Sequence, residues 1–429
     1  MKPNTTSSLS VWLEYLEMIH PKNIDLGLDR VNNVFRRMNL KIRGVKFIVG
    51  GTNGKGSTCA FLESFLLKSG YSVGLYTSPH IISFNERIRV NGKDISDQEI
   101  IDSFYFIENI RKEISLTYFE YSTLAALNIF ANKDLDVLIL EVGLGGRLDA
   151  VNIIDADCSI ITNIGIDHVE WLGDTRDSIG KEKSFIYRKN KSAICGDINP
   201  PDALLNYAYK INTNLRLINK DFSFIVDQKN KSWSYFGKNY NFRDLSMPKL
   251  FGNCQIMNAS IALSALDSVY PMLLTNCEII SFAIQKVFIP ARFQVISNNP
   301  SLIIDVSHNS HAAKVLSNNL QKSNNFHKTY AVIGMLKDKD VREVIRLLSK
   351  DIDYWYCAST YGARGLSSNE LAHIITTSTN IDVNSVFTFL NPSDALNVAL
   401  KNSSKLDRIL VFGSFVTVSE IYRVYSDKL

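Results

Sequence analysis

The sequence predicts an α/β protein with two domains: a P-loop-type domain with a parallel sheet at the N-terminal end, and a smaller, Rossmann-like α/β domain after it. Its 429 residues are two to three times the usual length of one domain. Short apolar runs alternate with segments of helical periodicity in both parts of the chain. A glycine-rich segment also separates the first apolar run from the next helical segment, as in folds that bind phosphate groups.

The first part of the chain reads as successive β-α-β units. It begins with a helix at 11–19, where apolar residues recur at helical spacing. The expected strands are 45–49, 72–76, 136–141 and 158–163, and the expected helices between them are 57–68 and 119–130. Because helices separate these strands, we expect parallel pairing, and the alternation should extend to about residue 200.

The second part begins after a polar stretch in which few strands are expected. A helix is predicted at 253–266, and Pro290 then interrupts the chain. We place the domain boundary there, which gives domains of residues 1–290 and 291–429. The second domain should contain strands near 302–306, 329–333, 354–358 and 408–412, separated by helices.

Composition and charge exclude several classes of protein. Hydrophobic residues make up 45% of the chain and charged residues 21%, which excludes a largely disordered protein. The formal net charge is only +4, so we expect neither nucleic acid nor membrane headgroups as partners, although small anionic ligands fit. The start of the chain lacks the pattern of a signal peptide, and no run approaches about 18 apolar residues. We therefore expect a cytoplasmic protein, and we expect a monomer.

The cysteines give no sign of a disulfide framework or a structural zinc site. All six are scattered, without any C-x-x-C pair. We expect them to be buried thiols: Cys59, Cys158, Cys195, Cys254, Cys277 and Cys357.

The strongest local signal is the segment GTNGKGS at 51–57. A glycine-rich turn that leads into a helix directs backbone N–H groups and the positive end of the helix dipole at phosphate oxygens. Lys55 would neutralise charge on the phosphates, and the Ser57 hydroxyl would reach an accompanying Mg²⁺ ion. Gly56 separates this lysine from the serine, so the spacing is not the common one. The alternative interpretation is an ordinary turn between a strand and a helix.

Oxygen donors for such a metal ion are expected at the carboxyl ends of the parallel strands. Glu141 closes one apolar strand, and Asp167 and His168 follow the next. Ser78 follows the strand at 72–76. Each residue also has an alternative interpretation. Glu141 would be a surface acid at a strand end, and Ser78 would be part of a turn before proline. His168 would be a structural histidine, because imidazole is an unusual ligand for Mg²⁺.

Together these motifs resemble the folylpolyglutamate synthases of the Mur ligase superfamily, which are ATP-dependent enzymes that form amide bonds. The stretch IDLGL at 24–28 and YFEY at 118–121 are most similar to the bacterial bifunctional members that are also dihydrofolate synthases. The matching motifs follow one another through nearly the whole chain: GTNGKGST at 51–58, YTSPH at 76–80, FNER at 84–87, LTYFE at 116–120, EVGLGGRLD at 141–149, DH at 167–168, PARFQ at 290–294, DVSHN at 305–309, GMLKDKD at 334–340 and GSF at 413–415.

The resemblance implies roles for individual residues. The residues implied to hold ATP are Thr52, Asn53, Gly54, Lys55, Gly56, Ser57, Asn258, Arg292, Asp305 and His308. Those implied to hold Mg²⁺, expected as two ions, are Ser78, Glu141 and His168. Lys183 matches a lysine that becomes carbamylated, and a carbamate would offer the metal two anionic oxygens that an ammonium group lacks. The implied catalytic residues are Lys55, Glu141, His168 and Lys183.

The pterin substrate is implied to lie against apolar and acidic residues, several of which would equally serve in packing. These residues are Ile24, Asp25, Leu26, Phe119, Glu120, Asp149 and Ala150.

Three residues depart from the family pattern. Phe185 stands where the family has a glycine after its lysine, and this bulky side chain calls the geometry of that loop into question. Cys254 replaces a frequent histidine, and Ala291 stands where glycine is usual before Arg292.

The implied reaction is ATP-dependent addition of L-glutamate to dihydropteroate and to tetrahydrofolate through an acyl phosphate. ATP is needed because a carboxylate does not react with an amine at neutral pH. Three other functions remain open: a folylpolyglutamate synthase without the second activity, another Mur-type ligase such as one for a peptidoglycan precursor, and a P-loop NTPase that acts as a switch or binding module.

Overall fold

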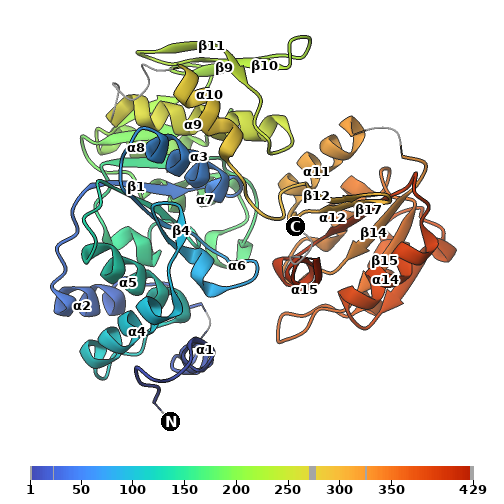
Figure 1. Ribbon diagram of the computed structural model, residues 1–429, viewed down its shortest axis with the longest axis horizontal. Helices are drawn as coiled ribbons and strands as arrows, with labels where there is room; N and C mark the ends of the chain where they lie inside the picture. Colours follow the sequence, from blue (N-terminus) through green and yellow to red (C-terminus); the bar gives the residue numbers. More distant parts are fainter. Residues whose placement is uncertain (1, 23, 270–276, 324–325, 426–429) are drawn as a thin grey trace. The chain divides into compact units, whose positions relative to one another are not determined.

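The computed structural model describes residues 2–22, 24–269, 277–323 and 326–425, and it contains two compact units (Figure 1). Each unit has a largely parallel sheet of its own, so the predicted α/β class is confirmed. The predicted boundary at residue 290 stays a prediction. The segments of the first unit are Met1–Ile164, Thr175–Lys249 and Ile256–Val287, and those of the second are Gly165–Asp174, Leu250–Gln255 and Phe288–Leu429.

The main sheet of the first unit has the strand order β4-β3-β2-β5-β1-β6-β7-β8. Strands β2, β5, β1, β6, β7 and β8 run parallel, and β3 and β4 continue the sheet antiparallel at one edge. Val49 of β1 lies opposite Glu141 of β5 and Ile160 of β6, so these three strands end at the same edge. The strands are β1 Val45–Gly50, β2 Val73–Tyr76, β3 Ile88–Val90, β4 Lys93–Asp94, β5 Val137–Glu141, β6 Cys158–Ile161, β7 Ser192–Cys195 and β8 Asn214–Leu217.

Several helices of this unit, such as α1, α4, α5 and α7, begin at Ser or Thr caps and bury apolar side chains. Helix α5 (Tyr118–Ala131) is apolar almost throughout and is buried over most of its length. Thr117 and Glu120 form a capping box at its start. The other helices are α1 Leu9–Met18, α2 Asp29–Met38, α3 Lys55–Lys68, η1 Phe84–Arg87, α4 Asp97–Arg111, η2 Ala150–Ile153, α7 Arg176–Ser184, α8 Asp202–Lys210, α9 Asn253–Val269 and α10 Cys277–Lys286.

The expectation of few strands between residue 200 and α9 is wrong. Strand β8 extends the parallel sheet, and a separate antiparallel sheet has the order β11-β10-β9. In β10, Trp233 and Tyr235 are buried and alternate with more exposed residues, which is the pattern of a strand with one covered face. The alternation of Trp233 and Tyr235 with two serines was the sequence signal for this strand. The strands are β9 Ser223–Asp227, β10 Ser232–Phe236 and β11 Asn241–Ser246.

The sheet of the second unit has the order β12-β13-β17-β14-β15-β16, with β12 antiparallel to β13 and the others parallel. Trp355, Ile333 and Phe412 are buried in its core together with Leu348 of α12. The sequence did not predict β12 and β16, which form the two edges. The elements are α6 Val169–Leu172, β12 Gln294–Asn298, β13 Ser301–Ile304, α11 Ser310–Lys322, β14 Thr329–Ile333, α12 Val341–Leu348, β15 Tyr354–Ala358, α13 Ser368–Ser378, η4 Val383–Ser385, β16 Val386–Phe389, α14 Pro392–Asn402, β17 Arg408–Phe412 and α15 Phe415–Tyr425.

The cysteines are only partly as expected. Cys59, Cys158, Cys195 and Cys357 are free and buried, as predicted. The prediction is wrong for Cys254 and Cys277, which are free but only partly buried. Both lie at the starts of helices, where side chains of the first turn are less completely covered.

None of the described helices is both long and apolar enough to cross a membrane.

A buried ion pair joins β8 to α9 in the first unit. Arg216 Nη1 lies 2.5 Å from Asp267 Oδ2, and the two side chains are 8% and 0% exposed. Asn239 Nδ2 donates to the other oxygen of Asp267 at 2.9 Å. Removal of the carboxylate would therefore leave a buried, uncompensated guanidinium group.

We predict that Asp267→Ala lowers the free energy of unfolding by about 3–5 kcal/mol, measured by urea denaturation of the first unit. As a control in the same unit, Glu113→Ala breaks the exposed pair with Arg37, whose side chains are 71% and 38% exposed, and should cost at most about 1 kcal/mol. Equal, small losses in the two variants would show that the Arg216–Asp267 pair does not stabilise the unit.

Candidate active site

The glycine-rich loop connects β1 to α3 in a conformation that requires glycine at two positions. Gly51 has φ +133° and Gly54, which caps α3, has φ +82°. A Cβ atom at Gly51 would overlap Thr162 Oγ1, and one at Gly54 would lie 2.6 Å from Asn258 Oδ1. The loop is therefore a defined cradle at the N-terminus of a 14-residue helix.

Residues at the end of β6 hold this loop in place. Asn163 accepts from the backbone N–H of Thr52 through its carbonyl (2.9 Å) and from that of Asn53 through its side chain (3.1 Å). Its Nδ2 donates back to the Asn53 carbonyl at 2.8 Å, and Thr162 Oγ1 donates to the same carbonyl at 2.6 Å. Neither Thr162 nor Asn163 was predicted from the sequence as a site residue. Their position directly after an apolar strand beside β1 was the signal that could have found them.

Two lysine side chains converge on this loop. Lys55 Nζ donates to the carbonyls of Gly51 and Thr52, at 3.2 Å each. Lys183 reaches the same Gly51 carbonyl from α7 at 3.0 Å, and its side chain is buried. Two ammonium groups beside helix-terminal N–H groups create a strongly positive cradle, and such a cradle favours an anionic ligand.

Glu141 and Ser78 lie together beside the first turn of α3. Glu141 is 4% exposed, and its Oε2 accepts from the backbone N–H of Ser78 at 3.1 Å. A Cβ atom at Gly56 would lie 3.6 Å from the same oxygen. A carboxylate and a hydroxyl are hard oxygen donors that suit Mg²⁺, so this part of the expected metal set fits. Within the described ranges, no group of three or more His, Cys, Asp or Glu side chains is arranged to hold a metal ion.

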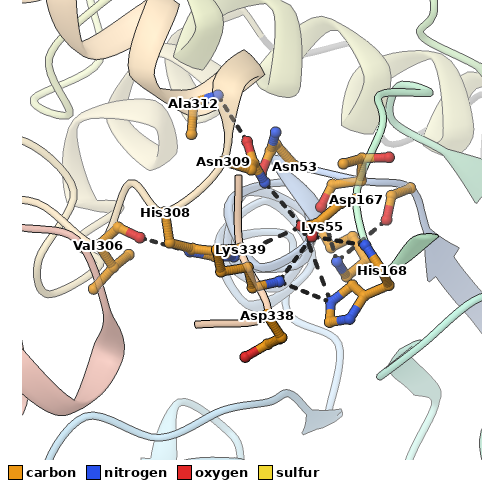
Figure 2. Close-up of polar contacts among 12 residues, drawn as sticks. Asn53, Lys55, Asp167, His168, Val306, His308, Asn309, Ala312, Asp338 and Lys339 are labelled. Atoms are coloured by element: carbon orange, nitrogen blue, oxygen red, sulfur yellow. Dashed lines mark hydrogen bonds and ion pairs between the residues drawn. The ribbon is translucent and has the colours of Figure 1, made fainter. Parts of the chain in front are cut away.

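In the second unit, Asp167 is the centre of a charged cluster (Figure 2). Lys339 Nζ lies 2.7 Å from Asp167 Oδ1, and Asn309 Nδ2 donates to Oδ2 at 3.0 Å. Burial alone would raise the pKa of Asp167, but Lys339, His168 and His308 outweigh it and hold this pKa well below its ordinary value. Lys339 Nζ also lies 3.5 Å from Nε2 of His168, so the expected metal ligand His168 is itself part of this charged cluster. Neither Lys339 nor Asn309 was predicted from the sequence to have a role.

His308 is held in its neutral form in this cluster. Its Nδ1 lies 2.8 Å from the carbonyl oxygen of Val306, and a carbonyl can only accept, so Nδ1 carries the proton. Burial and the nearby charge of Lys339 lower the pKa of His308 to about 4, although Asp167 acts in the opposite direction.

Asp305 and Arg292 lie near one another in the second unit, where Asp305 directly follows strand β13. Asp305 is buried and accepts from the backbone N–H groups of Phe293 and Ser307, at 2.8 Å each. Burial raises its pKa, which the charge of Arg292 partly counteracts. Ala291 has φ +57°, a conformation that favours glycine. The glycine that the family has at this position is therefore explained by the backbone.

The residues expected to hold a pterin lie near η2 and the start of α5. Asp149 is 3% exposed and caps η2, with its carboxylate accepting from the N–H groups of Leu144 (2.8 Å) and Val151 (3.0 Å). Burial raises its pKa to about 6, although these hydrogen bonds lower it. The ring of Phe119 packs on Gly143, where a Cβ atom would lie 2.6 Å from the ring. Glycine is therefore required beside Phe119.

Phe185 does not displace Lys183. It follows the last residue of α7, and its ring stacks on Tyr207 of α8 with the centroids 4.4 Å apart. The guanidinium carbon of Arg147 lies 5.7 Å from the centroid of the same ring. The large side chain is accommodated between these groups, and Lys183 keeps its buried position.

Comparisons with known proteins agree with the sequence motifs. Residues 49–266 match the Mur ligase middle domain, and residues 291–415 match the glutamate ligase domain of Mur ligases. A dihydrofolate synthase/folylpolyglutamate synthase of Buchnera aphidicola subsp. Schizaphis graminum is 42% identical over 98% of both chains. The Escherichia coli protein of the same name is 40% identical over 98% of this chain and 96% of its own.

Solved structures show the same likeness. E. coli FolC in complex with DHPP and ADP has a TM-score of 0.92, 39% identity and complete coverage of both chains. A bifunctional folylpolyglutamate synthase/dihydrofolate synthase from Yersinia pestis, complexed with AMPPNP and a Mn ion, has a TM-score of 0.90 and 40% identity over 99% of both chains.

The neutral state of His308 predicts a loss of stability in mild acid. Between pH 6.5 and about 4 the unfolded chain binds a proton that the folded chain does not, so the free energy of unfolding falls as the pH falls. Because the side chain is 23% exposed, we expect a loss of about 1–2 kcal/mol between pH 7.5 and 5.

Urea denaturation at the two pH values should show this loss in the wild type and not in His308→Gln. His373→Gln, at an exposed position on α13, serves as the control and should behave like the wild type. The same pH dependence in His308→Gln as in the wild type would contradict the assignment.

Proposed function

Because this chain belongs to the dihydrofolate synthase/folylpolyglutamate synthase family of Mur ligases, we propose that it uses ATP to add L-glutamate to dihydropteroate and to tetrahydrofolate. The observation that carries the proposal is the convergence of Lys55 and Lys183 on the glycine-rich loop, beside Glu141. Such a site suits a triphosphate and a metal ion. Relatives of this chain crystallised with ADP or with AMPPNP and Mn, which supports the same two ligands here.

ATP would bind with its phosphates on the loop. Backbone N–H groups of the loop and the dipole of α3 favour the anionic phosphates, and Lys55 supplies a full charge. Asn258 lies beside Gly54 and would contact the same nucleotide. The proposed ATP-binding residues are Thr52, Asn53, Gly54, Lys55, Gly56, Ser57, Asn258, Arg292, Asp305 and His308.

A divalent metal ion would be held through Ser78 and Glu141, with His168 as a further proposed ligand and two Mg²⁺ ions in all. When bound, the metal supplies positive charge that stabilises the phosphates during transfer. Carbamylation of Lys183 would replace an ammonium group near this site with an anionic group of two oxygen donors.

The residues of the chain then have to position the reactants. The acceptor carboxylate attacks the γ-phosphorus of ATP, ADP leaves, and an acyl phosphate is formed. The deprotonated amine of glutamate attacks the acyl carbon, phosphate leaves, and the nitrogen loses a proton as the amide forms. Lys55 would offset charge that develops on the transferred phosphoryl group. No nucleophilic side chain is required, because every bond forms between bound reactants.

The acceptor would lie against the segment before α2, the start of α5 and the start of η2. Ile24, Leu26 and Phe119 are apolar and only partly buried, as a surface that packs on a pterin ring requires. Dihydropteroate reacts through a carboxylate on its benzoyl ring, whereas a folate reacts through a longer glutamyl chain. The two ring systems therefore need two positions, or one that allows sliding. The residues proposed to form the acceptor surface or to support it are Ile24, Asp25, Leu26, Phe119, Glu120, Asp149 and Ala150.

The boundary between residues 290 and 291, the monomeric state and the cytoplasmic location stay predictions from the sequence.

The direct test measures incorporation of labelled glutamate with dihydropteroate or tetrahydrofolate as acceptor, together with phosphate release. We expect amide formation with both acceptors, and phosphate release that requires acceptor and glutamate. Lys55→Ala should lower both activities about 100-fold or more, because Lys55 would act in the phosphoryl transfer from ATP, a step that both acceptors share. Lys181→Ala, at an exposed position of α7, is the control and should change neither.

Each contrary result has a distinct meaning. Turnover of tetrahydrofolate alone reduces the function to folylpolyglutamate synthesis. Phosphate release that needs neither acceptor nor glutamate favours a P-loop NTPase. Full activity of Lys55→Ala with either acceptor excludes the proposed role of the loop.

Carbamylation of Lys183 makes a separate prediction. Lys183→Ala should lower both activities at least about tenfold, and short carboxylates such as acetate should restore part of the loss by supplying the missing oxygens. Removal of CO₂ should lower the wild-type rate. If the wild type is indifferent to CO₂ and acetate does not rescue the variant, Lys183 acts as an ammonium group.

A further inference from the structure

Arg30, in the first turn of α2, joins two carboxylates from different parts of the first unit. Its Nη1 lies 2.7 Å from Asp25 Oδ2, in the segment before the helix. Its Nη2 lies 3.1 Å from Glu120 Oε1, in the first turn of α5. The guanidinium group is planar and carries several donors in fixed directions, so it can hold both carboxylates at once.

Each of the two carboxylates that bind Arg30 also contacts a second group. Glu120 is buried, and its Oε2 also accepts from the backbone N–H of Thr117 at 2.8 Å. Asp25 Oδ2 lies 3.2 Å from His20 Nε2, and the other nitrogen of this histidine lies 3.1 Å from Ser115 Oγ. The Asp25 carboxylate is therefore held by both Arg30 and His20. Together these contacts connect the segment at 24–28 with the start of α5.

The carboxylates of this network belong to residues that adjoin the proposed acceptor surface in the sequence. Ile24 and Leu26 flank Asp25 in the sequence, and Phe119 precedes Glu120. Helix α2 also packs against η2, which begins after Asp149, and against α5, which lies beside it in Figure 1. A fixed Arg30 thus fixes the separation between the two apolar surfaces that would enclose a pterin ring.

We propose that Arg30 is a positioning residue for the pterin acceptor, and that the Asp25 carboxylate acts on Arg30 rather than on the pterin. This inference rests on the proposed function. Loss of Arg30 frees the segment at 24–28 from α5, so the acceptor surface loses its preorganised shape and acceptor binding weakens. The phosphate loop, which is held by Asn163 and Thr162, keeps its geometry.

The test compares Arg30→Met and Arg30→Lys with the wild type. Arg30→Met should raise KM for dihydropteroate about tenfold, with kcat and KM for ATP changed less than about twofold. Arg30→Lys should have an intermediate effect, because it keeps the charge but cannot hold both carboxylates in a fixed geometry. Arg30→Lys also retains a cation for buried Glu120, so it provides the measurement if Arg30→Met does not fold.

Arg89→Met is a closely matched control. Arg89 Nη2 lies 3.2 Å from Glu63 Oε2, and the side chains are 30% and 5% exposed, compared with 26% and 5% for Arg30 and Glu120. Loss of either pair should lower thermal stability to a similar extent. Only the Arg30 variants should raise KM for dihydropteroate, and equal changes in the Arg89 variant would overturn the positioning role.

A double-mutant cycle tests the role of Asp25. If Asp25 acts through Arg30, Asp25→Asn should add less than about twofold to the KM of Arg30→Met. If the KM of the double variant rises by the product of the two single-variant factors, Asp25 contacts the acceptor itself. That result would overturn this part of the proposal.

The wild type separates failure of the inference from failure of the proposed function. If the wild type turns over dihydropteroate and both Arg30 variants match it in KM, only the inference is wrong. If the wild type turns over neither acceptor, the proposed function fails and the inference falls with it.

Discussion

The candidate site depends on one carbonyl group, that of Gly51, which accepts from both Lys55 and Lys183. Two ammonium groups so close together repel each other, and burial of Lys183 adds a desolvation cost. Carbonyl oxygens and the fixed loop offset part of this cost. An anionic ligand, or conversion of one ammonium group to a carbamate, would relieve the remaining repulsion. The loop therefore favours the binding of negatively charged groups.

The same constraint explains the support around the loop. A backbone that presents its N–H groups to a ligand cannot also satisfy them within a helix or sheet. Asn163 and Thr162 therefore bind the remaining polar groups of the loop and fix its shape. In the second unit, Asp167 is held in the same way by Lys339 and Asn309. In each case a buried polar group is paired, and the pairing sets the position of a segment that carries candidate functional residues.

Arg30 follows this principle at the proposed acceptor surface. Its two carboxylate partners come from segments far apart in the sequence, and their negative charges would repel each other without a shared cation. Asp25, read from the sequence as a candidate for contact with the pterin, is engaged by Arg30 and His20 in the structure. A residue in a substrate-binding segment can thus act through the shape of the segment.

Local pattern was enough to predict β1, β2, β5 and β6 of the first unit, four strands of the second, and the glycine-rich loop. The strands at 329–333, 354–358 and 408–412 have the predicted bounds, because each is a continuous apolar run that ends abruptly. The prediction missed β3, β4, β7 and β8 of the main sheet, the strands β9–β11, and the edge strands β12 and β16. Edge strands are covered on fewer sides, so their sequences need fewer apolar residues.

The sequence by itself determined the α/β class, the phosphate loop and the place of Glu141 at a strand end, since these follow from periodicity and from short motifs. Only the tertiary structure decided which charged groups meet. Lys183 and Gly51 are 132 residues apart, and Arg30 and Glu120 are 90 residues apart. No local pattern specifies such pairs, because their partners are chosen by the packing of helices on the sheet and by the need to compensate each buried charge.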